Sequence, residues 1–195
     1  EHTDMKKLIY ALLAGTALTA ANAQQPPRIE IKLCNEQAIA KLMQKADKDT
    51  LYSAAQDCND KGRSATLLSA AAEKGHGQAA LKLAEQKYAD YYKFDAALWA
   101  LQAKQACEEL PPHLVKLLAD NPQITLDMPM ATPQIYNLSK HDLSILSDKA
   151  EKGDGKAAQR LADYYMYAAS SLPSAERQAK ADYWRMHANK LLANK

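Results

Sequence analysis

The chain has 195 residues, with 25 basic and 23 acidic side chains and a formal net charge of +2. Apart from a short leader, this length corresponds to about one domain. The small positive excess is spread along the chain and does not indicate a nucleic-acid-binding protein.

Residues 1–23 have the pattern of a few upstream residues followed by a secretory signal peptide. Two lysines follow Met5, and after them come the apolar run "LIYALLAGTALTA" and the small residues of "ANAQ". This order is typical of a signal peptide, with cleavage expected between Ala23 and Gln24. A membrane-spanning helix needs about 20 apolar residues, and this run is shorter and interrupted by Gly15. The remaining chain is therefore expected to be a soluble periplasmic protein without stable membrane insertion.

The three cysteines, Cys34, Cys58 and Cys107, can pair in an oxidising compartment, but one of them is left over. A Cys34–Cys58 bridge is favoured because both residues flank a predicted helical hairpin, and such a loop contributes about 3 kcal/mol. A Cys58–Cys107 bridge is the alternative. If the first bridge forms, Cys107 is expected to be a free thiol, buried as a small apolar residue.

After the leader, residues 24–33 ("QQPPRIEIKL") are expected to form an extended arm, because prolines forbid a helix start there. Beyond this arm the apolar residues recur with helical period, which predicts an all-α chain of about nine short helices and no strand. Asn35 is expected to cap the first helix, Asp49 or Thr50 the second, and Ser64 to open the third. Later helices are predicted at 77–92, 95–108, 112–118, 142–152, 156–171 and 175–194, with an irregular proline-rich connection at 121–137.

Two stretches repeat each other 78 positions apart (151 − 73): "AEKGHGQAALKLAEQKY" from Ala72 and "AEKGDGKAAQRLADYYM" from Ala150. In each, a glycine fits the left-handed conformation that ends a helix, and alanines let two helix axes approach closely. One helix pair cannot bury its own apolar face, whereas stacked pairs can, which predicts a solenoid. The residues expected to form this repeated packing are Gly75, Ala79, Ala80, Leu83, Ala96, Trp99 and Ala103 in the first copy, and Gly153, Ala157, Ala158, Leu161, Ala181, Trp184 and Ala188 in the second.

The pattern "AEKGxGxAAxxLA" followed by "AxxWxxxA" resembles the Sel1-like repeat, a relative of the tetratricopeptide repeat built from antiparallel helix pairs. The resemblance covers residues 68–107 and 146–194 and implies a right-handed α-solenoid. The chain departs from the family at Ala84 and Ala162, where glycine is usual. Residues 34–195 are then expected to form a single domain with a helix hairpin (34–62), a repeat (64–107), a degenerate repeat with the proline-rich connection (108–145) and a second repeat (146–195).

Two groups of tyrosines, in "YADYY" and "DYYMY", are the candidate binding residues. They complete the core if they follow the helical spacing. Adjacent helical residues diverge by about 100°, however, so some of the phenol edges are expected at the surface, where tyrosine is enriched in binding sites. The candidates are Tyr88, Tyr91, Tyr92, Tyr164, Tyr165 and Tyr167, with Tyr92 and Tyr165 expected beside the tryptophan helices.

No motif for a metal, a cofactor or a catalytic reaction accompanies the repeats. The histidines are scattered, and the position of His76 in the first copy holds Asp154 in the second, so a metal ligand is not predicted there. The protein is therefore not expected to be an enzyme.

Sel1-like proteins of bacteria commonly act as adaptors, so the resemblance implies a periplasmic scaffold, expected to be monomeric, that binds a protein or peptide in its solenoid groove. A periplasmic immunity protein that neutralises a secreted toxic effector is the alternative, and it would bind one cognate partner tightly. A cell-wall hydrolase is a third hypothesis, which would require a carboxylate in a deep cleft.

Overall fold

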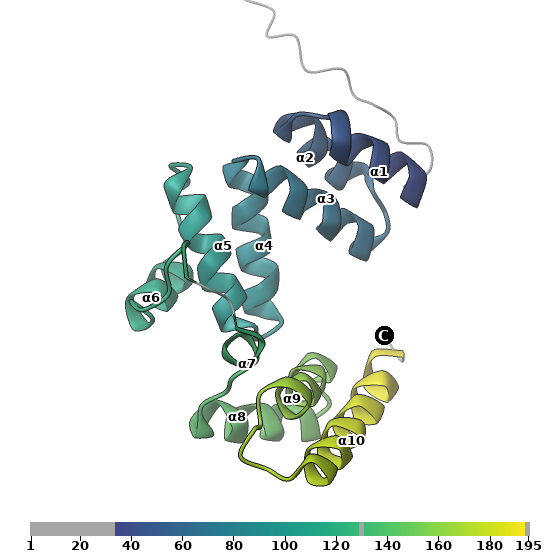
Figure 1. Ribbon diagram of the computed structural model, residues 1–195, viewed down its shortest axis with the longest axis vertical. Coiled ribbons are helices and arrows are strands. Elements are labelled where there is room, and N and C mark those ends of the chain that lie inside the picture. The colour runs from purple at the N-terminus through teal and green to yellow at the C-terminus, as the bar shows by residue number, and fades with distance from the viewer. Residues whose placement is uncertain (1–33, 129–130, 194–195) are drawn as a thin grey trace, which may run out of the picture.

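The computed structural model describes residues 34–128 and 131–193; the predicted signal peptide and arm lie outside these ranges. The described residues form ten α-helices and no strand and are arranged as an α-solenoid, in which α4 and α5 lie side by side and α3 crosses α4 at a large angle (Figure 1). The predicted fold class is confirmed, with one helix more than expected, because residues of the proline-rich connection form a short α7. The helices are α1 (Glu36–Lys45), α2 (Lys48–Asp57), α3 (Lys61–Glu73), α4 (Gly77–Ala89), α5 (Lys93–Gln105), α6 (Pro112–Asp120), α7 (Thr132–Ile135), α8 (Lys140–Glu151), α9 (Gly155–Tyr167) and α10 (Ser174–Ala193).

Short polar side chains fix where the first helices begin. Asn35 caps α1, as predicted, by accepting a hydrogen bond from an amide three residues later at 2.8 Å. The caps of α2 and α3 are Asp47 and Asp60, so both helices begin earlier than the sequence suggested. Each aspartate has an extended backbone and accepts from the third amide of its helix, the usual geometry of a helix N-cap. Gly62 lies inside the first turn of α3 and does not end the preceding helix.

Four helices are followed, two positions after their last residue, by a residue with positive φ: Gly75 (87°), Tyr91 (66°), Cys107 (63°) and Gly153 (97°). The backbone amide of the residue that follows each of these four donates to the carbonyl five positions before that amide, as from His76 to Ala71. The ends of α3, α4, α5 and α8 therefore have the same hydrogen-bond pattern. The two glycines adopt this conformation freely, whereas Tyr91 and Cys107 carry a Cβ that opposes it.

Cys107 is exposed, and the expectation of a buried thiol is wrong. The reason is its place in the chain, since it lies in the turn beyond α5 and not on an inner helix face. The disulfide joins Cys34 to Cys58, with their Cα atoms 5.5 Å apart, and it ties the start of α1 to the end of α2. The alternative Cys58–Cys107 bridge is excluded by this pairing.

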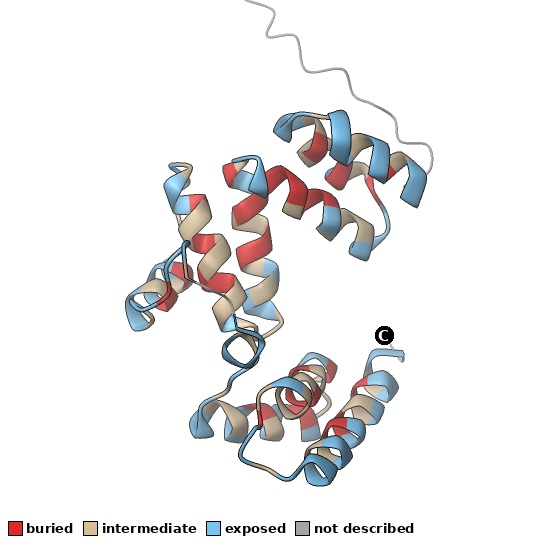
Figure 2. Cartoon of the chain, viewed as in Figure 1, coloured by how far each residue is buried: buried red, intermediate tan, exposed pale blue. Residues whose placement is uncertain are grey.

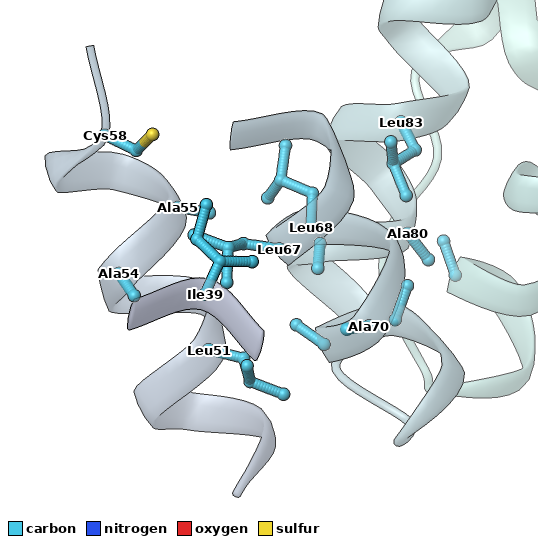
Figure 3. Packing of buried hydrophobic residues seen from close by; sticks show 14 residues of the cluster. Ile39, Leu51, Ala54, Ala55, Cys58, Leu67, Leu68, Ala70, Ala80 and Leu83 are labelled. Atoms are coloured by element: carbon cyan, nitrogen blue, oxygen red, sulfur yellow. The ribbon is translucent and has the colours of Figure 1, made fainter. Parts of the chain in front are cut away.

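Small side chains fill the contacts within the helix pairs α4–α5 and α9–α10. Ala80 and Leu83 of α4 belong to the apolar cluster that also includes side chains of α1, α2 and α3 (Figure 3). Trp184 is buried in the second copy, whereas Trp99 is half-buried and packs against two clusters. All the alanines of the repeat pattern have no exposed surface: Ala79, Ala80, Ala96, Ala103, Ala157, Ala158, Ala181 and Ala188.

The buried residues form two separate cores, which Figure 2 shows as red segments where helices face one another. In the N-terminal unit, α1–α6, two clusters are linked because Leu81, Trp99 and Leu110 pack against both. In the C-terminal unit, α8–α10, the core is a third cluster, to which the N-terminal unit contributes Tyr91. The solenoid therefore consists of two packed units, and their junction is described below.

Replacing Ala158 by tryptophan is expected to lower the free energy of unfolding by about 1–3 kcal/mol, because the larger side chain overpacks the contact between α9 and α10. Ala179→Trp is the matched control, since Ala179 is an exposed residue within α10. Urea denaturation measures both variants. An Ala158→Trp protein as stable as the native chain would contradict the close helix contact.

Replacing Cys107 by glycine is expected to raise the free energy of unfolding by about 0.5–1 kcal/mol, because glycine adopts a positive φ without a Cβ clash. Cys107→Ser is the control, since it removes the thiol but keeps the Cβ. Thermal denaturation compares the two. If serine stabilised the protein as much as glycine, the thiol and not the backbone would be responsible.

Candidate binding site

The two units meet at a polar seam, in which residues 90–93 of the α4–α5 turn lie against α8 and α9. At its centre is Arg160 of α9, which is only 2% exposed. Its guanidinium donates hydrogen bonds to the carbonyls of Tyr91, Tyr136 and Asn137, each at 3.1 Å. It also lies 5.1 Å from the ring centroid of Tyr92. One side chain thus joins α9 to the α4–α5 turn and to the segment after α7.

Two of the predicted tyrosines donate hydrogen bonds across this seam. The hydroxyl of Tyr91 donates to Asp154 at 2.6 Å, and the hydroxyl of Tyr92 donates to Asp163. Burial, together with these carboxylates, raises the pKa of both phenols above its usual value of 10.0, so both remain protonated donors. Because these hydroxyls have partners inside the chain, Tyr91 and Tyr92 contribute to the seam and do not offer free donors to a partner.

Charged groups surround the seam. Lys93 forms an ion pair with Asp142 at 2.7 Å, and Lys156 forms one with Asp90 at 2.6 Å. The hydrogen bonds from Lys93 and Ser139 hold the pKa of Asp142 below its usual value of 3.8, although burial alone would raise it. Each of these ion pairs contributes little to the free energy of unfolding by itself. Both, however, connect the same two units that the hydrogen bonds of Arg160 connect.

The other candidate tyrosines make ring contacts. Tyr88 is 37% exposed, and its ring centroid is 4.8 Å from that of His113 on α6. Tyr164 and Tyr165 are half-buried on α9, with ring centroids 5.1 Å apart. Tyr167 is 46% exposed and packs its ring 4.7 Å from that of Tyr136. Tyr88 nevertheless lines a small cleft together with Tyr91, and the ring of Tyr136 lies between those of Tyr92 and Tyr167, so several candidates gather around the seam.

A groove of about 790 Å³ lies over α4, between α2 and α3 on one side and the connection from α5 to α6 on the other. We call it the α4 groove. Its apolar lining includes Leu68, Leu81 and Leu110, and exposed glutamine side chains border it. Sequence reasoning missed this groove because its walls come from four elements, although Leu81, Lys82 and Glu85 share a helical spacing that places them on one face.

The charged groups of the α4 groove are separated along its length. Lys82 donates to the side-chain oxygen of Gln56 on α2 at 2.8 Å, and its ammonium lies 5.3 Å from the ring centroid of Tyr52. Glu85 lies nearer α6, where the imidazole of His113 is 2.9 Å from its carboxylate. The groove therefore has a cation on its α2 side and the carboxylate of Glu85 on its α6 side, one helical turn apart on α4, and a second carboxylate, that of Glu109, also lines it.

A smaller cleft of about 240 Å³ lies between the α4–α5 turn and α8, and its lining includes Tyr88, Tyr91 and Ile145. Within residues 34–128 and 131–193, no cluster of three or more His, Cys, Asp or Glu side chains is suited to hold a metal ion. The helices of these same ranges include none with the length and apolar character needed to cross a membrane.

A comparison of this chain with protein-family models, with curated proteins and with solved structures finds no significant match.

Replacing Arg160 by methionine is expected to lower the free energy of unfolding by about 2–3 kcal/mol, because three main-chain carbonyls at the seam lose a charged donor at about 1 kcal/mol each. Arg185→Met is the control, since Arg185 forms an exposed pair with Asp182 at 3.5 Å and should change stability by no more than about 0.5 kcal/mol. Chemical denaturation followed by circular dichroism measures both. Equal stability of the two variants would contradict the central role of Arg160.

Proposed function

We propose that this protein is a periplasmic scaffold of the Sel1-like type, which binds a segment of a partner protein in the α4 groove. Helical-repeat solenoids typically bind partners through surfaces to which several successive helices contribute. The α4 groove has this construction, since its walls come from α2, α3, α4 and the start of α6. The disulfide between Cys34 and Cys58 supports export to an oxidising compartment.

The lining of the groove supports a polypeptide ligand. The apolar side chains provide area that a partner side chain can bury, and the volume lies within the range of about 300–1,000 Å³ that is typical of ligand sites. The exposed amides of Gln56, Gln78 and Gln86 carry donors and acceptors that match the main-chain groups of a bound segment. The oxygen of Gln56 already accepts from Lys82 and the nitrogen of Gln78 already donates to Glu108, so these two amides offer their remaining groups. From Gln78 to Gln86 the helix rises roughly 12 Å, at 1.5 Å per residue, which accommodates about three or four extended residues.

The single observation that carries the proposal is this combination of apolar walls and exposed amides in one groove over α4. A deep catalytic cleft would instead bring acidic or nucleophilic groups together. In the α4 groove the carboxylate of Glu85 interacts with His113, and the amine of Lys82 binds the side chain of Gln56.

Replacing Gln86 by tryptophan is expected to block the groove and reduce recovery of a partner from envelope extract by about tenfold or more, because the indole occupies volume that the partner needs. Gln105→Trp is the matched control, since Gln105 is an exposed glutamine on α5 outside the groove lining. Quantitative mass spectrometry after affinity capture compares both variants with the native chain, and thermal denaturation checks that all three are folded. Equal recovery with both variants would contradict binding in this groove.

A further inference from the structure

The α4 groove and the polar seam occupy equivalent places in the two repeats. With the repeat spacing of 78 positions, Lys82 corresponds to Arg160 (160 − 82) and Glu85 corresponds to Asp163 (163 − 85). Both cations lie close to an aromatic ring, at 5.3 Å for Lys82 over Tyr52 and at 5.1 Å for Arg160 over Tyr92. A comparison of the two copies therefore indicates what the groove is built to bind.

In the second copy this place is filled by the chain itself. The α4–α5 turn presents the main-chain carbonyl of Tyr91 to Arg160, and the hydroxyl of Tyr92 to Asp163. The ring of Tyr92 lies beside the guanidinium, so the cation contacts both a carbonyl and an aromatic face. In this turn, Tyr91 provides an acceptor for Arg160, and Tyr92 provides a donor for Asp163.

In the first copy only part of this arrangement is present. Tyr52 of α2 stacks on His76, which corresponds to Asp154, and it lies below the amine of Lys82. Within the described ranges no tyrosine hydroxyl donates to Glu85; its carboxylate lies 2.9 Å from the imidazole of His113, and the two side chains are 44% and 38% exposed. Glu85 lines the α4 groove, whereas its counterpart Asp163 accepts from the hydroxyl of Tyr92.

We propose, on the basis of the function proposed above, that the α4 groove binds a tyrosine-bearing segment of the partner protein. The phenol hydroxyl of this tyrosine donates to the carboxylate of Glu85, its ring lies on the apolar surface near Lys82, and a neighbouring main-chain carbonyl accepts from that amine. A hydroxyl that donates to a carboxylate forms a charge-assisted hydrogen bond, which is stronger than a neutral one. The amine over the ring adds a cation–π contact.

The size and charge of the groove fit this ligand. Its volume of about 790 Å³ accommodates a tyrosine with its flanking residues. A ligand tyrosine is neutral, so it reaches the carboxylate of Glu85 without adding a negative charge to a groove that Glu85 and Glu109 already line. An acidic side chain in the same place would repel Glu85, and a purely aliphatic one would leave its carboxylate without a new donor.

The test uses the full chain and a labelled synthetic peptide, ADYYKF, with the sequence of residues 89–94. In the intact chain this segment contacts Arg160 and Asp163 of the second copy. The peptide is expected to bind the native chain. Replacing the second tyrosine of the peptide by phenylalanine should weaken binding by about tenfold, because one charge-assisted hydrogen bond is lost. Glu85→Ala in the protein should weaken binding of the tyrosine peptide by a similar factor.

The two changes are expected to be coupled, so that the phenylalanine peptide binds the native and the Glu85→Ala chains equally well. Glu73→Ala is the control, since Glu73 is an exposed glutamate of α3 outside the groove lining. Fluorescence anisotropy measures every combination. A peptide from the predicted arm, QPPRIEIKL, contains no tyrosine and should bind at least about tenfold more weakly than ADYYKF.

Three results would overturn this inference: no binding of ADYYKF, equal binding of its phenylalanine form, or a loss that does not depend on Glu85. These outcomes are distinct from a failure of the proposed function. If Gln86→Trp abolishes partner recovery but the tyrosine peptide does not bind, the groove binds a partner of different chemistry. If the peptide binds as expected but Gln86→Trp leaves partner recovery unchanged, the pocket exists but the scaffold uses another surface.

Discussion

The arrangement of the two units depends on the buried guanidinium of Arg160. A charged group removed from water is costly unless its donors are satisfied, and here the guanidinium donates to three main-chain carbonyls and lies beside an aromatic ring. These bonds are directional, so they set the orientation of α9 relative to the α4–α5 turn. Apolar packing alone does not, because the cores of the N-terminal and C-terminal units are separate clusters.

The local pattern of the sequence predicts much of this fold. The spacing of the alanines predicts which faces of α4, α5, α9 and α10 are buried, and Gly75 and Gly153 indicate where two helices end. The expectation that the thiol of Cys107 is buried is wrong, because Cys107 lies in the turn after α5 and has a positive φ. This turn conformation depends on hydrogen bonds to the preceding helical turn. A positive φ at a tyrosine or a cysteine cannot be predicted from the residue type, as it can for a glycine.

The candidate site was less accessible to sequence reasoning, because its parts are distant in the chain. Arg160 differs from its counterpart Lys82 only by a change of one basic side chain for another, yet one is buried in a seam and the other borders an open groove. The tyrosines were recognised as candidates, but their hydroxyl partners, Asp154 and Asp163, lie more than 60 positions away. Two nearly identical repeats thus have different roles, which are set by the segment that each one faces.

The division of the apolar residues into two separate cores has a consequence for how the molecule opens. Buried apolar area is the main source of cooperativity in unfolding, so helices that share a cluster open together, and those that do not can open on their own. The C-terminal helices α8–α10 have their own cluster and are held to the rest mainly by polar contacts. Their amide protons are therefore expected to exchange through an opening of this unit, at a lower free energy than unfolding of the whole chain.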